Sequence, residues 1–508
     1  MSGINGKQDR IVVIGGLSAG PSAAAKARRE NEHAHIIMFE KGPDISYATC
    51  GIPYALSGVI ENRKKLIVVE VDLLRDRFNI DVRTNEEVTS IDTKAKTIIT
   101  SCGVYNYDKL IYAAGASSNV PPIKNVDAAS NWSTCRTLAD FDKIMKEGVA
   151  TGAKHITVLG GGLIGVEVAE NLREAGKNVT LIEGGPKILP MWGDKFSYMA
   201  KKEMTARGVE VITDTYVSEL EIDNGQATHV VISEDKKIKT DMVIVSTGIR
   251  PRTQMLIDQG AEHLPNGALK VNERMETSIQ DVYAAGDCAA IKNIQTGEHD
   301  YFPLGTHSNK GGRAAGSNAA GKVEIFKGAY RTSIVKVFDY TLARTGLGVD
   351  YLVKNNIPFK TSLTVAGATP GYYPGQKDLI TELYYTPETG KILGAELIGE
   401  HGVDKRVDVL STAIYANLSI DDLPQIDLAY APPFSPAKDP VVVTGFVADN
   451  FNRVENLKEI GVNELSDHIR TTNPESYQLL DVRTSKEFDS GSISGAINID
   501  LHQLRDNL

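Results

Sequence analysis

Residues 155–183 read HITVLGGGLIGVEVAENLREAGKNVTLIE, an apolar run followed by a glycine-rich turn, an amphipathic stretch and a second apolar run. This order predicts a strand over 155–160, a helix over 162–175 and a strand over 178–183. The turn has the spacing GxGxxG, in which glycines allow a tight bend and let the backbone approach a pyrophosphate at the helix N-terminus. Glu183 ends the second strand, where a carboxylate can accept both ribose hydroxyls and repels a 2′-phosphate. The pattern therefore predicts a dinucleotide site that favours NADH over NADPH.

A similar unit opens the chain. Its expected elements are a strand over 10–16, a helix over 22–29 and a strand over 34–40, which ends in Glu40. The turn GGLSAG has the outer glycines, but Leu17 stands in the middle position. Two such units predict two nucleotide sites, each on a parallel sheet, in an α/β protein.

Chain length, the distribution of apolar residues and net charge limit the possible folds and partners. At 508 residues the chain is too long for one compact core, so three or four domains are expected. No long apolar run lacks charges or glycines, which argues against a membrane span. The polar N-terminus has no apolar signal core, so a cytoplasmic location is expected. A formal net charge of −10 disfavours nucleic acid as a partner.

The second half of the chain changes pattern at about residue 326. Antiparallel strands are expected over 333–340, 361–365 and 379–385, with a helix over 405–416. The proline-rich stretch 430–436 cannot continue a helix or a central strand. A further small unit is expected to begin near Asn456.

Two more segments, YDKLIYAAG at 107–115 and VYAAGD at 282–287, are apolar strands that end at glycine. With the two turns, in this order along the chain, they resemble the pyridine nucleotide–disulfide oxidoreductase superfamily over residues 10–445. The resemblance implies that the first unit binds FAD and that the second, inserted unit binds the nicotinamide cofactor.

The resemblance also implies the cofactor-binding residues. Those expected to bind FAD are Gly15, Gly16, Ser18, Ala19, Gly20, Glu40, Lys41, Ala114, Gly115, Gly286 and Asp287. Those expected to bind NADH are Gly160, Gly162, Leu163, Ile164, Gly165, Glu183 and Gly248. Many relatives carry an aromatic residue where this chain has Leu163, so the resemblance does not extend to an aromatic gate over the flavin.

Cys50 lies in SYATCGIPY, residues 46–54, soon after the first unit. Relatives similar to glutathione reductase carry a second cysteine five positions earlier, where this chain has Ile45, so their redox disulfide cannot form here. Cys50 must then cycle alone between a thiolate and a mixed disulfide, a persulfide or a sulfenic acid. We expect its thiolate to be stabilised by the flavin and a nearby helix N-terminus.

The other cysteines are less suited to catalysis. Cys102 falls in a predicted hairpin turn, Cys135 follows a connection between domains, and Cys288 is expected to be a packing residue near the flavin. The four cysteines are far apart and form no CxxC pair, so neither a metal site nor a disulfide framework is predicted.

Among single-cysteine members, NADH peroxidases and oxidases carry a histidine in the first glycine turn, where this chain has Ser18. The closer resemblance is to coenzyme A–disulfide reductases and NADH-dependent persulfide or polysulfide reductases. It rests on SYATCGIPY and on FDYT at 338–341, GYYPG at 371–375, GVDKR at 402–406 and YAPPFS at 430–435.

This branch implies further site residues and a homodimer. Tyr372 and Tyr430 are expected to reach Cys50 of the partner subunit and to stabilise or protonate a leaving thiolate; the alternative for Tyr430 is interface packing. The expected coenzyme A contacts are Ser22, Lys26, Arg29, Ser46, Thr49 and Lys438. The cations would pair with its phosphates, unless Lys26 and Arg29 form only a solvated helix face. A basic contact of one relative falls at Phe78, so the site would be incomplete or depend on Arg77.

The tail, QLLDVRTSKEF at 478–488 and GSISGAIN at 491–498, looks like the first half of a rhodanese domain. No cysteine follows Cys288, so this segment cannot carry a persulfide; either the sequence is a truncated form or the segment is structural. The expected domains are FAD-binding over 1–120 and 243–325, NAD-binding over 121–242, dimerisation over 326–447, a linker over 448–457 and a partial rhodanese-like segment over 458–508.

The sequence thus predicts an FAD-dependent, NADH-using flavoprotein that reduces coenzyme A disulfide, or coenzyme A persulfide and polysulfide, through Cys50. Two alternatives stay open: an NADH oxidase that reduces oxygen, and a redox-sensing flavoprotein without turnover. The preferred acceptor is not determined by the sequence.

Overall fold

The computed structural model describes residues 9–149, 152–233, 236–454 and 460–507. The chain divides into two compact units, and the boundary falls after Asp449. The expected start of a further unit near Asn456 lies outside the described residues. Within those residues, no helix combines the length and the apolarity that crossing a membrane requires.

The first nucleotide unit forms a five-stranded parallel sheet in the order β19-β7-β1-β2-β3. Both later glycine-ending segments join it as β7 and β19, which confirms that one sheet gathers distant parts of the chain. Its strands are β1 Arg10–Ile14, β2 His35–Phe39, β3 Asp81–Arg83, β7 Lys109–Tyr112 and β19 Val282–Ala284. A side sheet contains β4 Val88–Asp92, β5 Thr97–Thr100 and β6 Val104–Asn106.

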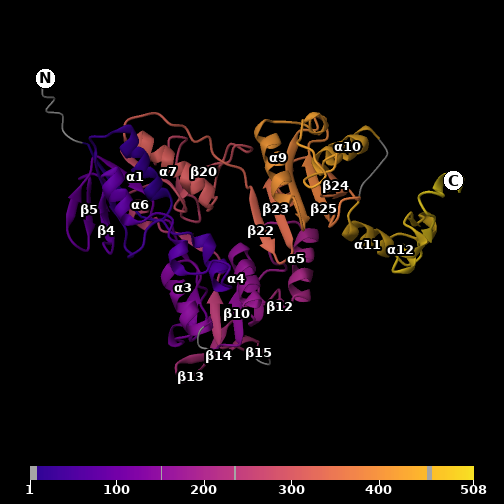
Figure 1. Cartoon of the computed structure of the whole chain (residues 1–508), viewed down its shortest axis with the longest axis horizontal. Helices are drawn as coiled ribbons and strands as arrows, with labels where there is room; N and C mark the ends of the chain where they lie inside the picture. Colours follow the sequence, from indigo (N-terminus) through magenta and orange to yellow (C-terminus); the bar gives the residue numbers. More distant parts are fainter. Residues whose placement is uncertain (1–8, 150–151, 234–235, 455–459, 508) are drawn as a thin grey trace. The chain divides into compact units, whose positions relative to one another are not determined.

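Two helices lie side by side on this unit, α1 Ala19–Glu30 and α7 Gly305–Ala319 (Figure 1). The sequence pattern placed the first helix over 22–29, whereas α1 begins at Ala19 and includes Pro21. Proline is tolerated there because the first turn of a helix needs no intrahelical N–H donor.

The second nucleotide unit repeats the arrangement with a parallel sheet in the order β12-β11-β10-β16-β9. The prediction of two parallel sheets is therefore confirmed. Its elements are β9 Trp132–Thr134, α3 Leu138–Ile144, β10 His155–Leu159, α4 Leu163–Glu174, β11 Asn178–Ile182, α5 Asp194–Ala206, β12 Val209–Ile212 and β16 Met242–Val245. An antiparallel sheet beside it contains β13 Glu219–Asp223, β14 Gln226–Ser233 and β15 Lys236–Lys239.

After the two nucleotide units, the chain up to Asp449 forms an antiparallel sheet in the order β22-β23-β26-β25-β24, which is covered by helices. Its elements are β22 Ser333–Val337, β23 Tyr340–Gly346, β24 Lys360–Gly367, β25 Asp378–Tyr385, β26 Ile392–Gly399, α9 Val403–Tyr415 and α10 Pro440–Arg453. The antiparallel strands and the helix near 405–416 agree with the prediction.

Two local predictions were wrong. The single strand expected over 333–340 is a hairpin, because Phe338 adopts φ 54° and turns the chain between β22 and β23. Phe338 is buried, so its apolar side chain imitates a strand residue in the sequence. The linker expected from 448 is helical as far as Arg453, because α10 buries Val441 and Ala448 against the sheet.

The tail, described by itself, contains α11 Val462–Thr471, α12 Ser485–Asp489 and a two-stranded parallel sheet of β27 Leu480–Asp481 and β28 Ile497–Asn498. A capping box between Thr484 and Glu487 fixes the start of α12.

The contact between α1 and α7 depends on glycine. A Cβ added at Gly316 would lie 2.1 Å from the carbonyl oxygen of Ala23, whereas one added at Gly103 would meet no atom closer than 4.0 Å. We expect Gly316→Ala to destabilise the fold by about 2 kcal/mol, because the helices must separate. Gly103→Ala should be nearly neutral in the same urea-unfolding measurement. Equal urea midpoints for the two variants would contradict this account of the packing.

Candidate functional site

Both glycine turns have the same close backbone crossing. A Cβ at Gly20 would lie 1.8 Å from the carbonyl oxygen of Gly15, and one at Gly165 would lie 1.8 Å from that of Gly160. Only glycine allows each helix to begin so close to the preceding strand, which leaves the helix N-terminus free to face a phosphate. The middle residue, Leu17 in the first turn, does not disturb this crossing.

The acid that ends each second strand is held in the same way in both units. Glu40 accepts hydrogen bonds from the backbone N–H groups of Gly16 and Gly42, each at 2.8 Å. Glu183 accepts from Gly161 at 2.6 Å and from Gly185 at 2.7 Å. Each carboxylate is thereby fixed beside its own glycine turn, where a ribose would lie.

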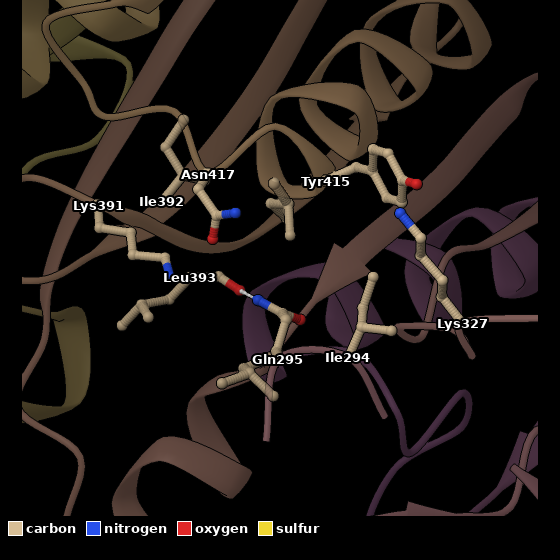
Figure 2. Close-up of a pocket in the computed structure, with 10 residues that line it drawn as sticks. Ile294, Gln295, Lys327, Lys391, Ile392, Leu393, Tyr415 and Asn417 are labelled. Atoms are coloured by element: carbon tan, nitrogen blue, oxygen red, sulfur yellow. Dashed lines mark hydrogen bonds between the residues drawn. The ribbon is translucent and has the colours of Figure 1, made fainter. Parts of the chain in front are cut away.

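One cavity of about 1600 Å³ is lined by residues of both nucleotide units. Single ligand sites are usually 300–1,000 Å³, so this space can hold more than one ligand. Its walls include Ser18 of the first turn, Gly162 of the second and the side chain of Cys50. Figure 2 shows a second, smaller cavity of about 330 Å³ beside Gln295 and Leu393, which none of the predicted site residues lines.

Some of the predicted cofactor residues line the cavity, others shape the glycine turns, and the rest do neither. Those that line the cavity are Ser18, Asp287, Gly160, Gly162, Leu163, Ile164, Glu183 and Gly248. Gly115, Gly162 and Gly248 have nothing within 4 Å of the position of a Cβ, so ligand atoms could approach their backbones. Gly15, Gly16, Gly20, Glu40 and Gly165 shape the turns instead. Ala19, Lys41, Ala114 and Gly286 also lie outside the cavity wall.

Five of the six residues expected to contact coenzyme A line this cavity: Ser22, Lys26, Arg29, Ser46 and Thr49. Lys26 is 9% exposed and forms ion pairs with Glu30 and, at 3.3 Å, with Glu324. It is neither a solvated surface lysine nor a free cation. Lys438 is exposed and does not line the cavity within this chain.

Phe78 and two arginines line the same end of the cavity. The guanidinium of Arg29 lies 5.1 Å from the Phe78 ring centroid and that of Arg77 lies 5.7 Å from it. Arg28, which is buried, fixes this loop by donating to the backbone carbonyls of Phe78 and Asn79. These hydrogen bonds of Arg28 could not be predicted from the sequence, where Arg28 looks like any other cation of the helix.

Cys50 lies in a short 3-10 turn, Thr49–Gly51, ahead of α2 Ile52–Leu56. Its side chain reaches the cavity, yet surrounding protein atoms desolvate it, and this raises the pKa of the thiol. A hydrogen bond with Thr49 and the charge of Arg136 act against that rise. The helix that follows has only five residues, and stabilisation of the thiolate by the flavin and a helix N-terminus stays a prediction.

The remaining cysteines occupy other positions. Cys102 is exposed in the turn between β5 and β6, as predicted. Cys135 is buried in the cavity wall, and burial raises the pKa of its thiol. Burial also raises the pKa of Cys288 to about 12, and its thiol donates to the backbone oxygens of Tyr112 and Ala285. Its place in the fold is that of a packing residue.

Tyr372 and Tyr430 are brought together but not to Cys50. Their hydroxyls are 3.4 Å apart, and the side chains are 74% and 52% exposed. The hydrogen bond with Tyr430 raises the pKa of Tyr372. Neither ring lines the cavity of its own chain.

Two further charged groups in the cavity were missed from the sequence. Arg136 pairs with Asp287 at 2.7 Å, which joins the two nucleotide units by an ion pair. Glu167 on α4 lines the cavity and accepts a hydrogen bond from the hydroxyl of Tyr54 at 3.1 Å. The spacing of Leu163, Ile164 and Glu167 on one helix face is the signal that could have revealed Glu167.

In the part of the chain that the structure describes, no cluster of three or more histidine, cysteine or acidic side chains could hold a metal ion. Histidine is also absent from the described residues that line the large cavity.

Three family models match the chain. The pyridine nucleotide-disulphide oxidoreductase model matches residues 9–301, its dimerisation domain matches 332–440, and a rhodanese-like domain matches 462–508. The three matches follow one another in the order of the domains expected from the sequence.

Relatives and solved structures are similar over most of the chain. A coenzyme A disulfide reductase of Staphylococcus haemolyticus is 31% identical over 86% of this chain and 99% of its own. The structure of reduced Bacillus anthracis CoADR-RHD is 38% identical, with a TM-score of 0.94 over 99% of this chain and 90% of its own. A NAD-dependent persulfide reductase from A. fulgidus is 33% identical, with a TM-score of 0.90 over 98% and 92%.

Proposed function

The chain belongs to the pyridine nucleotide-disulphide oxidoreductase family, and from that premise we propose that it uses NADH and FAD to reduce coenzyme A disulfide, or coenzyme A persulfide and polysulfide, through Cys50. The observation that carries this proposal is the single cavity into which both glycine turns and Cys50 open. The two dinucleotides, the thiol of Cys50 and the sulfur substrate can therefore meet in the same cavity.

The residues of the first unit fit FAD. The crossing of Gly15 and Gly20 frees the N-terminus of α1 for the pyrophosphate, and Glu40 lies where a ribose is bound. Asp287 and the open backbone of Gly115 would bound the flavin end. When bound, FAD would relay electrons from NADH to the sulfur of Cys50.

The second unit would bind NADH in the same manner. The N-terminus of α4 faces the pyrophosphate, and the carboxylate of Glu183 accepts the ribose hydroxyls. Leu163, an aliphatic residue, lies at the start of α4 on the cavity wall. The chain therefore binds NADH without an aromatic gate at this position.

The end of the cavity near Phe78 suits the phosphorylated adenosine of coenzyme A. Arg29 and Arg77 are exposed and present cations there, and the N–H groups of their guanidiniums can pair with phosphates. Lys26 lines the cavity wall and is ion-paired with Glu30 and Glu324, so its contact with a coenzyme A phosphate stays a prediction.

The catalytic arrangement is completed by a homodimer. Tyr372 and Tyr430 do not face Cys50 of their own chain, and they belong to the segment that matches a dimerisation domain. The exposed Phe434 in the same segment, and the exposed Phe446 shortly after it, provide apolar area for an interface. In the dimer, the tyrosine pair of one subunit donates to the thiolate that leaves when Cys50 of the other attacks.

Reduction of oxygen is less well supported, because Ser18 occupies the cavity wall where the histidine of peroxidases and oxidases would lie. The test is NADH consumption by the FAD-containing protein with coenzyme A disulfide, coenzyme A persulfide, polysulfide or oxygen as the acceptor. Turnover of about one per second or faster with a sulfur acceptor supports the proposal. Turnover with oxygen alone would overturn it.

Residues 462–508 carry the rhodanese-like match and contain no cysteine. They therefore supply no sulfur-carrying thiol to the reaction proposed for Cys50.

Cys50→Ser should abolish disulfide and persulfide reduction, because serine cannot form the mixed disulfide. FAD content and reduction of the flavin by NADH should remain, since neither requires the thiol; flavin absorbance in stopped-flow experiments measures this. Cys102→Ser, which removes an exposed thiol outside the cavity, is the matched control. Retention of more than a few per cent of turnover in Cys50→Ser would exclude Cys50 as the nucleophile.

Tyr430→Phe should lower kcat with the disulfide by roughly 10- to 100-fold, because it removes only the hydroxyl that stabilises the leaving thiolate. Dimerisation, FAD content and flavin reduction should not change. Tyr372→Phe should show a similar or smaller loss, since the two hydroxyls are hydrogen-bonded. Tyr373→Phe, next in the chain, serves as the control. Normal turnover in both Tyr430→Phe and Tyr372→Phe would exclude a catalytic role for the two hydroxyls. Interface packing would then be the remaining role of the two tyrosines.

Glu183→Gln should raise kcat/KM for NADPH relative to NADH by about tenfold, because about 1.4 kcal/mol of repulsion against the 2′-phosphate is lost. The amide can still accept one of the two backbone hydrogen bonds, so the turn should keep its shape. Glu210→Gln, an exposed position on the neighbouring strand β12, should leave the ratio unchanged. Wild-type protein with equal kcat/KM for the two cofactors would refute this role of Glu183.

A further inference from the structure

The thiol of Cys50 must lose a proton before it can attack, because the thiolate is the nucleophile. Burial is the largest influence that raises the pKa of this thiol, and the charges of Glu167 and Asp287 raise it further. The protein groups around the thiol therefore favour its protonated form, so an acceptor for this proton would assist the attack.

Glu167 is the acceptor that the fold supplies. It lines the same cavity as Cys50, and its carboxyl accepts a hydrogen bond from Tyr54. Tyr54 follows Cys50 by four residues and lies on α2, which packs against α4, the helix that carries Glu167. Burial raises the pKa of Glu167 to about 7, while the hydrogen bond from Tyr54 acts in the opposite direction. A carboxyl with this pKa can both take up and release a proton near neutral pH.

The other ionisable groups around Cys50 and Glu167 are unsuited to this task. Asp287 is paired with Arg136 at 2.7 Å, and Glu170 is ion-paired with Lys336 of β22. The phenol of Tyr54 and the thiol of Cys135 also face Glu167, but burial raises the pKa of each far above neutrality.

We propose that Glu167, oriented by Tyr54, takes the proton from the Cys50 thiol when the thiol attacks its substrate. The assignment rests on the proposed role of Cys50. The S–H bond of Cys50 breaks and an O–H bond forms on Glu167. The thiolate then forms a bond to one sulfur of the disulfide, and the S–S bond breaks.

The departing sulfur leaves with the electron pair and takes a proton from the tyrosine pair of the partner subunit. Glu167 returns its proton to the solvent, from which the tyrosine is reprotonated. Cys50 is oxidised and the departing sulfur is reduced, so the exchange needs no outside electrons and no net proton.

The first test measures the protonation of Cys50 without any sulfur substrate. The FAD-containing protein, with Cys50 reduced, is alkylated with iodoacetamide from about pH 5 to about pH 10, and peptide mass mapping separates Cys50 from Cys102. Glu167→Gln should lower the midpoint for Cys50 by about one pH unit, because a nearby negative charge is removed. The variant should fold, since the amide oxygen can still accept from Tyr54.

The second test measures turnover of the same variant. In the wild type, kcat should fall below about pH 7 as Glu167 becomes protonated. In Glu167→Gln this limb should disappear, and kcat should drop roughly 10- to 100-fold with little change in KM. A thiol that ionises more easily but attacks more slowly is a combination that a purely structural defect would not produce.

Two variants control the interpretation. Glu174→Gln removes the same charge from an exposed position of α4 and should alter neither the midpoint nor the pH profile. Tyr54→Phe removes the hydrogen bond that lowers the pKa of Glu167, so the limb should move to higher pH. This variant decides the question if Glu167→Gln fails to fold.

An unchanged alkylation midpoint in Glu167→Gln, or a wild-type limb that persists in it, would overturn the inference. If the midpoint shifts but no sulfur acceptor supports turnover in the wild type, the proposed function fails while the electrostatic link between Glu167 and Cys50 remains.

Discussion

The crossing of backbone at two glycine turns is the constraint on which the site depends. Gly20 and Gly165 pack against the carbonyl oxygens of Gly15 and Gly160 at distances that no side chain allows. Each crossing places a helix N-terminus beside the end of a strand and directs backbone N–H groups toward the cavity. The acids at the ends of the next strands are then fixed by hydrogen bonds to the same turns.

The position of Cys50 is determined by residues next to it that pack outside the first nucleotide unit. Ile52 and Leu56, which follow Cys50 in α2, and Leu66 are buried in the same core as α4 of the second nucleotide unit and as strand β22 of the antiparallel sheet. The thiol is thus supported by the domain that would bind NADH, although it follows the first nucleotide unit in the sequence. This explains how one short segment can present a sulfur atom to both cofactor sites.

Charge pairing decides which ionisable groups in the cavity remain available. Arg136 is occupied by Asp287, and Lys26 is occupied by two carboxylates. Arg29 and Arg77 remain at one end for an anionic ligand, and Glu167 remains near Cys50 for a proton. The cavity therefore separates binding of phosphates from proton transfer, as a bulky thiol-derived substrate requires.

The sequence by itself determined the features that depend on neighbours along the chain: both strand–turn–helix units, the acids Glu40 and Glu183, the solitary Cys50 and the antiparallel strands. Local spacing specifies these because a glycine turn or an alternating strand is formed by adjacent residues. Only the tertiary structure showed that Phe338 turns a hairpin, that α10 replaces part of a linker, and that Glu167 meets Tyr54. Those outcomes depend on burial and on contacts between distant segments, which spacing along one chain does not encode.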